Sequence, residues 1–440
     1  MEFTLKRQEI VLPLPPVAPH VVTLSENDQI MPPLYTSFVY FFSPPSNPPQ
    51  SASLTLALAR ALAAFPPVGG RLKARSNGTG MDVECHNQGV VFVEAHAAAT
   101  LDQLLNTGKG DVRGGMYQPS PLWTSLAPNP YEDQSLDKPL LYTQLTRLAC
   151  GGVVVVVMLH HLVADGAGLS HFVASWAELA REHPITAPPH LDRACMQART
   201  PPCPSFDHPE YIVHQTIPSF SLSATAQPPP MTSRIFEFLP QDIATLKERA
   251  SKADSNPVTG FQALAAHIWK HATKARAIES SQEVKLGWAV DGRKRFDNPA
   301  LPTNYFGNVN FYGYAEATAG EVAAQPLRDV AARVASGTQR VTDAYMRSAL
   351  DLVASQASPA LVTGSFVGAA DLALTSWTHF PAYDVDWGWG RPVFFGVPVC
   401  AFTGLAVLLP HPRGGVNALV GMFQSHMDAL LSDSDFYPVE

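Results

Sequence analysis

The side chains best suited to chemistry lie within one short string, His160-His161-Leu162-Val163-Ala164-Asp165-Gly166. A neutral imidazole, with an ordinary pKa near 6.5, can take a proton from a hydroxyl or an amine and return it to a leaving thiolate. Asp165 could orient that imidazole directly or pair with a distant arginine, and Gly166 permits a backbone angle that other residues resist. From the string alone, a general base at His161 is a chemical possibility; a structural histidine at a strand end is the alternative.

The elements around this string should place it at the edge of a sheet. Val153–Leu159 is uniformly apolar and rich in β-branched residues, which predicts a central strand buried on both faces. A helix is expected from Gly168 to about Arg181, with its large apolar residues on one side. Polar residues that follow a central strand face the crevice where ligands bind in open α/β sheets.

Strands and helices alternate irregularly along the chain, which indicates an α/β fold with mixed sheets. Its 440 residues predict two domains: residues 1–190 with the histidine string, a Pro-rich crossover at 191–230 without regular elements, and residues 231–440. The other expected strands are Thr36–Phe42, Leu140–Leu148, Ile235–Leu239, Lys285–Val290, Val393–Val399 and Gly404–Leu409, and the other expected helices are Leu54–Phe65, Gln241–Ala250, Gly260–Ala275 and Met422–Leu431.

Composition excludes several classes of protein. The net charge of −8 argues against general nucleic-acid binding. Five scattered cysteines without a CxxC pair indicate neither a disulfide framework nor a zinc site, so no metal is expected. The longest apolar run is too short to span a bilayer, and the N-terminal residues contain no continuous apolar stretch typical of a secretory signal. A cytosolic location is therefore expected, and the protein is expected to be a monomer.

A second string, Asp386-Trp387-Gly388-Trp389-Gly390, lies in the right order after the first. Together they resemble the two signature motifs of the BAHD acyltransferases, the second with Trp387 in place of the usual Phe. Weaker matches cover nearly the whole chain: Phe65-Pro66-Pro67-Val68-Gly69-Gly70-Arg71-Leu72, Leu191-Asp192-Arg193, Val290-Asp291-Gly292-Arg293 and Tyr305-Phe306-Gly307-Asn308.

The resemblance implies two similar domains of the chloramphenicol acetyltransferase type, with the active-site channel at their interface. It implies that His161 is the base and that Asp165 is structural and pairs with Arg293. Asp386, Gly388, Trp389 and Gly390, like Gly166, would support the site structurally. Acyl-coenzyme A is then a co-substrate and a small alcohol or amine is the acceptor, with no resident cofactor.

The sequence is most similar to the hydroxycinnamoyl transferase branch of that family. There a Thr-Ser-Trp string, matched by Thr375-Ser376-Trp377, supplies groups near the tetrahedral intermediate, and a hydroxyl and an indole N–H suit a developing oxyanion. The chain has no Gly-x-Ser-x-Gly elbow, so direct attack without an acyl-enzyme is expected.

Three positions bear on the substrate. Thr363 stands where members that use shikimate commonly carry Arg, and a threonine cannot pair with a carboxylate as Arg does. Tyr35 stands where those members often have His, and Tyr40 could contact donor or acceptor or be a packed strand tyrosine.

Other interpretations remain open at this level. A condensation-type enzyme that takes acyl groups from a carrier protein shares the histidine string, and a BAHD-like protein can act through partners without turnover. A loose basic cluster is either a solvated face or an attraction for coenzyme A phosphates; it comprises Lys270, Lys274, Arg276, Lys285 and Arg293 to Arg295.

Overall fold

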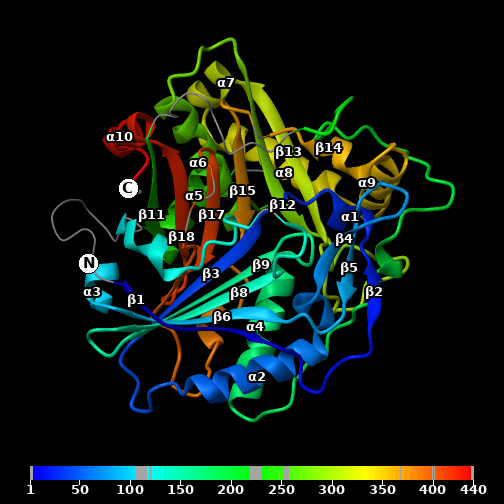
Figure 1. Cartoon of the computed structure of the whole chain (residues 1–440). Helices are drawn as coiled ribbons and strands as arrows, with labels where there is room; N and C mark the ends of the chain where they lie inside the picture. The colour runs from blue at the N-terminus through cyan, green and yellow to red at the C-terminus, as the bar shows by residue number, and fades with distance from the viewer. Residues whose placement is uncertain are drawn as a thin grey trace.

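Two mixed sheets with helices packed on them form the molecule (Figure 1). The computed structural model describes residues 3–105, 116–117, 121–133, 135–218, 230–251, 257–366, 368–398, 400 and 402–437. Each half of the chain builds most of one sheet, and both sheets contain parallel and antiparallel pairs. The fold class expected from the sequence is therefore confirmed.

The N-terminal sheet places the histidine string at the end of its most deeply buried strand. Its order is β1 (Phe3–Val11), β6 (Val90–Ala97), β8 (Leu141–Leu148), β9 (Val153–His160), β3 (Tyr35–Phe42) and β16 (Phe394–Gly396). Every residue of β9 is buried, because β8 and β3 flank it and other elements cover both faces. Helices α2 (Ser51–Ala64) and α4 (Gly166–Ala180) pack against each other along this sheet (Figure 1).

The C-terminal sheet has seven strands, and more of the described helices come from this half of the chain than from the other. Its order is β13 (Asn310–Thr318), β12 (Glu283–Asp291), β15 (Leu372–Ser376), β17 (Leu405–Pro410), β18 (Val416–Phe423), β11 (Met231–Phe238) and β7 (Met116–Tyr117). The helices of this half are α5 (Pro240–Ala250), α6 (Gly260–Ala275), α7 (Ala319–Ala324), α8 (Leu327–Arg340), α9 (Asp343–Ala354) and α10 (Gln424–Ser432).

Each sheet includes one short strand from the other half of the chain. β16 pairs antiparallel with β3, and β7 pairs antiparallel with β11. The C-terminal segment that carries the second signature string therefore joins the N-terminal sheet. The two halves are interlocked through backbone hydrogen bonds as well as side-chain packing.

Smaller elements complete the described part of the chain. They are a three-stranded sheet of β2 (His20–Thr23), β5 (Met81–Cys85) and β4 (Arg71–Ala74), the pair β10 (Tyr211–Val213) and β14 (Val362–Gly364), helices α1 (Glu26–Gln29) and α3 (Leu101–Leu105), and five 3-10 turns, η1 (Pro66–Gly69), η2 (Pro121–Leu126), η3 (Arg193–Met196), η4 (Pro359–Leu361) and η5 (Ala382–Asp384). No helix in these described ranges has the length and apolar character that a membrane span requires.

The expectation that the Pro-rich crossover lacks regular elements is wrong for its described part. It contains η3 and β10, and α9 anchors it: the Asp351 carboxylate accepts from the backbone N–H groups of Arg199 and Cys203, and Ser348 Oγ from those of Ser205 and Phe206. These side chains replace the backbone partners that a proline-rich segment cannot supply. Residues 219–229 of the crossover lie outside the described residues.

The other expected elements agree with the structure, with shifts at their ends. The helix expected at Gly168 begins at Gly166, because Asp165 caps it. The last helix begins at Gln424, since Met422 belongs to β18, a strand that the sequence analysis missed.

Candidate active site

The histidine string forms a tight turn between β9 and α4. The N–H of His161 donates to the carbonyl of Leu34 (2.8 Å), and the N–H of Val163 donates to that of His160 (2.9 Å). Asp165 is the N-cap of α4 and accepts a hydrogen bond from the N–H of Gly168 (2.9 Å). Strand end, turn and helix cap together fix the position of His161 through the backbone.

The two adjacent histidines have different environments. His160 is only 2% exposed, and its Nδ1 accepts a hydrogen bond from the N–H of Leu162 (3.3 Å). Burial, with smaller contributions from the positive charges of Lys138 and His161, lowers the pKa of His160 to about 3. His160 is therefore a neutral, packed side chain, and His161 is the half-buried member of the pair.

The imidazole of His161 is held by Asn308, which comes from the other half of the chain. Its Nδ1 lies 3.1 Å from Asn308 Oδ1. The Asn308 amide nitrogen donates to Asp28 Oδ1 and to the carbonyl of His161, both at 2.8 Å. Both of these partners are acceptors, so the amide must present its NH₂ to them and its oxygen to His161. His161 must then carry its proton on Nδ1.

The consequence is a base with its lone pair on Nε2. Among the described residues nothing hydrogen-bonds to that nitrogen, although it is not fully buried. Burial lowers the pKa of His161 and outweighs the raising effects of a hydrogen bond to the residue's own backbone and of Asp165, Asn308 and Asp28. A neutral imidazole near pH 7, with a free Nε2, can accept a proton.

The carboxylate of Asp165 bonds to Arg293 and joins the two halves of the chain. It is 1% exposed, its oxygens lie 2.9 and 3.0 Å from the two Nη atoms of Arg293, and it also accepts from the N–H of Val309 (2.9 Å). Burial by itself would raise the pKa of Asp165, but the charge and hydrogen bonds of Arg293 outweigh it and the pKa is lowered. The structure thus brings Asp165 and Arg293 together as a bidentate pair.

The expected reason for Gly166 is wrong, because its backbone does not occupy the left-handed region. A Cβ added there would lie 3.1 Å from the Phe380 ring and 3.2 Å from Trp377 Nε1. The glycine therefore gives aromatic side chains room to approach the start of α4. Phe38 stands edge-on to Trp377 at 5.1 Å, and the Trp377 and Phe380 rings are stacked at 6.0 Å.

Thr375 and Trp377 come from the end of β15 and the residue after it. Both side chains are half-buried, and the N–H of Trp377 donates to the carbonyl of Leu408 (2.7 Å). In the described part of the chain no hydrogen bond joins either side chain to His161. Trp377 nevertheless packs with Phe38 and Phe380 beside the start of α4, whereas no hydrogen bond in the described part of the chain relates Thr375 to the histidine turn.

The second signature string forms a loop that Asp386 closes. Asp386 Oδ1 accepts from the N–H groups of Gly388 (2.7 Å) and Gly390 (2.9 Å), whose φ angles are +99° and +102°. These left-handed conformations favour glycine at both positions. Trp387, 3% exposed, packs edge-on against Tyr40 (5.5 Å), and Trp389 stacks on Trp387 (5.8 Å). The loop therefore fastens the C-terminal half onto β3.

Comparisons with known proteins agree with this geometry. A sequence model of the Transferase family matches residues 1–436. The chain is 34% identical to a shikimate O-hydroxycinnamoyltransferase of Nicotiana tabacum, over 97% of this chain and 98% of that protein. It is 36% identical to hydroxycinnamoyltransferase 2 of Oryza sativa subsp. japonica, over 92% of each chain. This chain belongs to the BAHD acyltransferase family.

Solved structures share the fold of this BAHD enzyme. Vinorine synthase superposes with a TM-score of 0.73 at 22% identity, covering 97% of this chain and 96% of that one. TRI101 of F. graminearum, solved with coenzyme A and T-2 mycotoxin, gives a TM-score of 0.74 at 21% identity, covering 95% and 98%. BAHD acyltransferases use coenzyme A thioesters as co-substrates, and this chain is accordingly an acyltransferase.

The two tyrosines expected at the substrate site of this BAHD enzyme are packed instead. Tyr35 donates its hydroxyl to the carbonyl of Pro139 (2.7 Å), and its ring lies edge-on to His160 at 5.0 Å. Tyr40 is 1% exposed beneath Trp387. Both are better explained as core residues of β3 than as ligand contacts. Thr363 lies in β14, where its Oγ1 is 2.8 Å from His214 Nε2.

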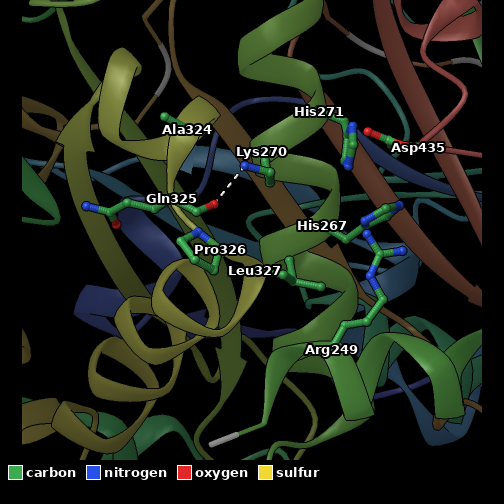
Figure 2. Close-up of a pocket in the computed structure, with 9 residues that line it drawn as sticks. All are labelled: Arg249, His267, Lys270, His271, Ala324, Gln325, Pro326, Leu327 and Asp435. Atoms are coloured by element: carbon green, nitrogen blue, oxygen red, sulfur yellow. Dashed lines mark hydrogen bonds between the residues drawn. The ribbon is translucent and has the colours of Figure 1, made fainter.

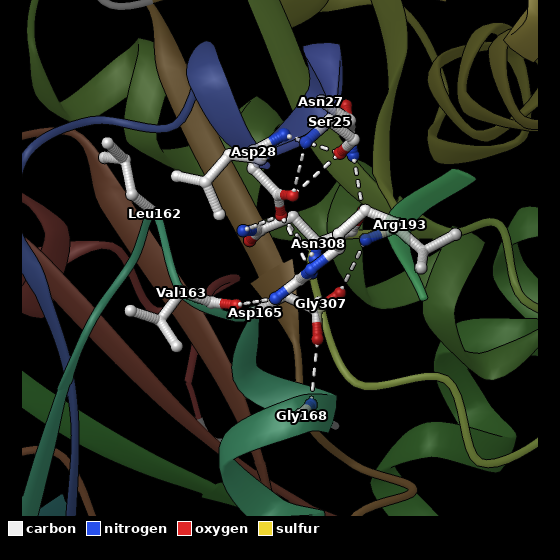
Figure 3. A network of polar contacts seen from close by, with 12 residues as sticks. Ser25, Asn27, Asp28, Leu162, Val163, Asp165, Gly168, Arg193, Gly307 and Asn308 are labelled. Carbon is white, nitrogen blue, oxygen red and sulfur yellow. Dashed lines mark hydrogen bonds and ion pairs between the residues drawn. The ribbon is translucent and has the colours of Figure 1, made fainter. Parts of the chain in front are cut away.

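A second buried ionic network, which the sequence did not predict, lies beside His161 and is built on Asp28 and Arg193 (Figure 3). Asn308 belongs to the Tyr305–Asn308 string, but no role for it could be predicted from the sequence. Ser25 and Asp28 form a capping box at the start of α1, a local signal that the sequence does carry. That signal locates a helix start but not its partners, which lie 165 and 280 residues further along the chain.

Most side chains of the basic cluster of this BAHD enzyme bond to other protein groups: Lys274 to Asp433, Arg276 to the carbonyl of Asp371, and Arg293 to Asp165. A cavity of about 370 Å³ between α5, α6 and the start of α8 is lined by Arg249, His267 and Lys270 among others (Figure 2). Lys270 Nζ donates to the carbonyls of Ala323 (2.6 Å) and Gln325 (2.8 Å). All residues lining this cavity come from the C-terminal half, so it is separate from the histidine turn. Among the described residues no group of three His, Cys, Asp or Glu side chains could hold a metal.

Proposed function

We propose that this acyltransferase moves a hydroxycinnamoyl or related aromatic acyl group from coenzyme A to a small alcohol or amine, with His161 as general base. The observation that carries this is the free Nε2 of His161, in a turn whose last residue, Gly166, is approached by Trp377 and Phe380, with Phe38 packed on Trp377. Flat aromatic surfaces suit an aromatic acyl group. Similar proteins are described as O-hydroxycinnamoyl and N-hydroxycinnamoyl transferases, so both acceptor types fall within the proposal.

The proposed reaction proceeds by direct attack. His161 Nε2 takes the proton of the acceptor O–H or N–H as the acceptor oxygen or nitrogen bonds to the thioester carbonyl carbon. The tetrahedral intermediate collapses, the carbon–sulfur bond breaks, and the thiolate of coenzyme A receives the proton that His161 holds. Each turnover therefore leaves His161 neutral and ready for the next acceptor.

Thr375 and Trp377 are proposed to stabilise the intermediate. A hydroxyl and an indole N–H would donate to the oxyanion, where charge develops only in the transition state. The position of Trp377 Nε1 beside Gly166 supports this role for the indole. For Thr375 the support is the resemblance of the Thr-Ser-Trp string alone.

Asp165, Arg293 and the loop from Asp386 to Gly390 are proposed to support the site without touching substrate. The acceptor is proposed to lack a carboxylate at the position that Thr363 faces, because a threonine offers no charge to pair with it.

The experiment that tests the proposed function crosses several acyl-coenzyme A donors with alcohol and amine acceptors and identifies products by mass. His161→Ala should lower turnover by at least ~100-fold, the usual loss for a missing general base. His160→Gln is the matched control, because it keeps the neutral neighbour of similar polarity and should retain most activity. Full activity in His161→Ala would contradict the mechanism. Transfer only from a carrier-bound acyl group would favour a condensation-type enzyme, and inertness toward every thioester would favour a non-catalytic role.

A further inference from the structure

We propose that Asp28 and Arg193 are positioning residues for His161: through Asn308 they hold the imidazole as the tautomer with its proton on Nδ1. This inference rests on the proposed function of His161. Neither residue touches the reacting atoms. Their contribution is to decide which nitrogen of the base faces the acceptor.

The Asp28 carboxylate is the anchor of the arrangement. It is fully buried and accepts hydrogen bonds on both oxygens. Oδ2 accepts from the N–H (2.9 Å) and the hydroxyl (2.8 Å) of Ser25, and Oδ1 accepts from the backbone N–H (3.0 Å) and side-chain NH₂ (2.8 Å) of Asn308. All four of these hydrogen bonds are donated to the carboxylate, so its oxygens act as acceptors. It can therefore be bonded only by the NH₂ side of the Asn308 amide.

The orientation of Asn308 follows from this anchor. A flipped amide would place its oxygen against Asp28 Oδ1 and against the carbonyl of His161, each an acceptor without a hydrogen to share. Asn308 is itself fully buried, so water cannot relieve that repulsion. Asp28 thus fixes the orientation of the Asn308 amide. The amide oxygen then faces Nδ1 of His161, which must carry the proton.

Arg193 pairs with the buried carboxylate of Asp28 and also donates a hydrogen bond to the histidine turn. Its Nη1 lies 3.3 Å from Asp28 Oδ1, and its Nη2 donates to the carbonyl of Val163 (2.7 Å) (Figure 3). The guanidinium is 3% exposed and stands over the ring of Tyr305. A Cβ on Gly307 would overlap Nη1, so the glycine is needed for this approach. One arginine of the crossover therefore ties α1 to the turn that carries the base.

The direct test reads the tautomer of His161 in the whole protein with ¹⁵N-histidine labelling and two-bond ¹H–¹⁵N correlation, with His161→Gln to assign the signals. We expect wild-type His161 to be neutral with its proton on Nδ1, and Asp28→Asn to show a mixture of tautomers. Asp28→Asn should also lower kcat by ~10- to 100-fold with little change in KM for acyl-coenzyme A, as for loss of a correctly placed base. Arg193→Lys should act in the same direction.

Asp351→Asn is the matched control. Asp351 is also fully buried and paired with an arginine, Arg199, but its hydrogen bonds go to the crossover. It should lose stability without changing the tautomer or the ratio of kcat to KM. A wild-type His161 protonated on Nε2 would overturn the proposal even if Asp28→Asn does not fold. Unchanged kcat and tautomer in a folded Asp28→Asn would do the same. The Nδ1–H tautomer in a protein that transfers no acyl group would uphold the positioning and refute the proposed function.

Discussion

The carboxylate of Asp165 accepts hydrogen bonds from both Nη atoms of Arg293, which lies 128 residues further along the chain, and forms none with His161. Asp165, the fourth residue after His161, thus links the two halves of the chain. Arg293 also bonds to Gly307 O (3.0 Å), next to the residue that orients the base. The Asp165–Arg293 pair and His161 both bond to the 307–309 segment, but they form no hydrogen bond with each other.

Asp165→Ala should destabilise the protein by ~3–5 kcal/mol, because it leaves a buried guanidinium without its counter-ion. The midpoint of denaturant unfolding measures this loss. Asp291→Asn is the control, since Asp291 contacts the same arginine (3.1 Å) from an exposed position and should cost no more than ~1 kcal/mol. A stable, soluble but inactive Asp165→Ala would point to an orienting role in catalysis instead.

The acid limb of the kcat/KM profile should have its midpoint below pH ~6.5, the ordinary histidine pKa. Burial disfavours the imidazolium of His161, so the neutral form that acts as base persists to lower pH. Rate measurements from pH 4.5 to 8, with stability checked at each pH, give the midpoint. An acid limb above pH 7 would mean that the base is stabilised in its charged form.

Stability should fall as the pH drops below about 6.5, the pKa of histidine in the unfolded chain. The folded pKa values of His160 and His267 are both lowered to about 3, so the unfolded chain binds more protons between these limits. Each such histidine should cost ~1.4 kcal/mol per pH unit in this window. Denaturant unfolding at pH 7.0 and 5.5 measures the slope, and His267→Gln, which can keep the bond to the Phe436 carbonyl (2.9 Å), should reduce it. An unchanged slope in that variant would contradict the assignment.

Trp387→Ala should destabilise by ~3–5 kcal/mol, the usual cost of deleting a buried aromatic side chain. The indole packs between Tyr40 and Trp176 (5.3 Å), so its removal loosens the loop on β3. Trp387→Phe should cost much less, because the indole N–H is buried without a partner in the described part of the chain. Thermal unfolding distinguishes the two variants, and equal losses would show that the loop needs the indole itself.

Thr363→Arg should raise turnover of a carboxylate-bearing acceptor such as shikimate relative to a neutral alcohol, since Arg can form a bidentate pair with a carboxylate. The ratio of the two kcat/KM values measures the change. Thr363→Gln is the control for side-chain size without charge, and a ratio that rises equally in Thr363→Gln would exclude an ionic cause.

Sequence patterns were sufficient for features set by local chemistry and by motif spacing. The apolar run of β9 and the helix that follows it predicted the place of the histidine turn, because periodicity and turn residues act within a few positions. The family was predicted from the resemblance of the two signature strings, and the role of His161 as base stays a prediction. They also gave Asp386, Gly388 and Gly390 as one unit, since that loop closes on itself through hydrogen bonds between near neighbours.

Tertiary structure alone decided what surrounds the base. Which of two adjacent histidines is buried, why Gly166 is needed, and where Tyr40 points all depend on segments that are distant in the chain. Asp28, Asn308 and Arg193 were beyond sequence reasoning for the same reason. A buried polar group must find partners wherever the fold supplies them, and here those partners come from three separate regions of the chain.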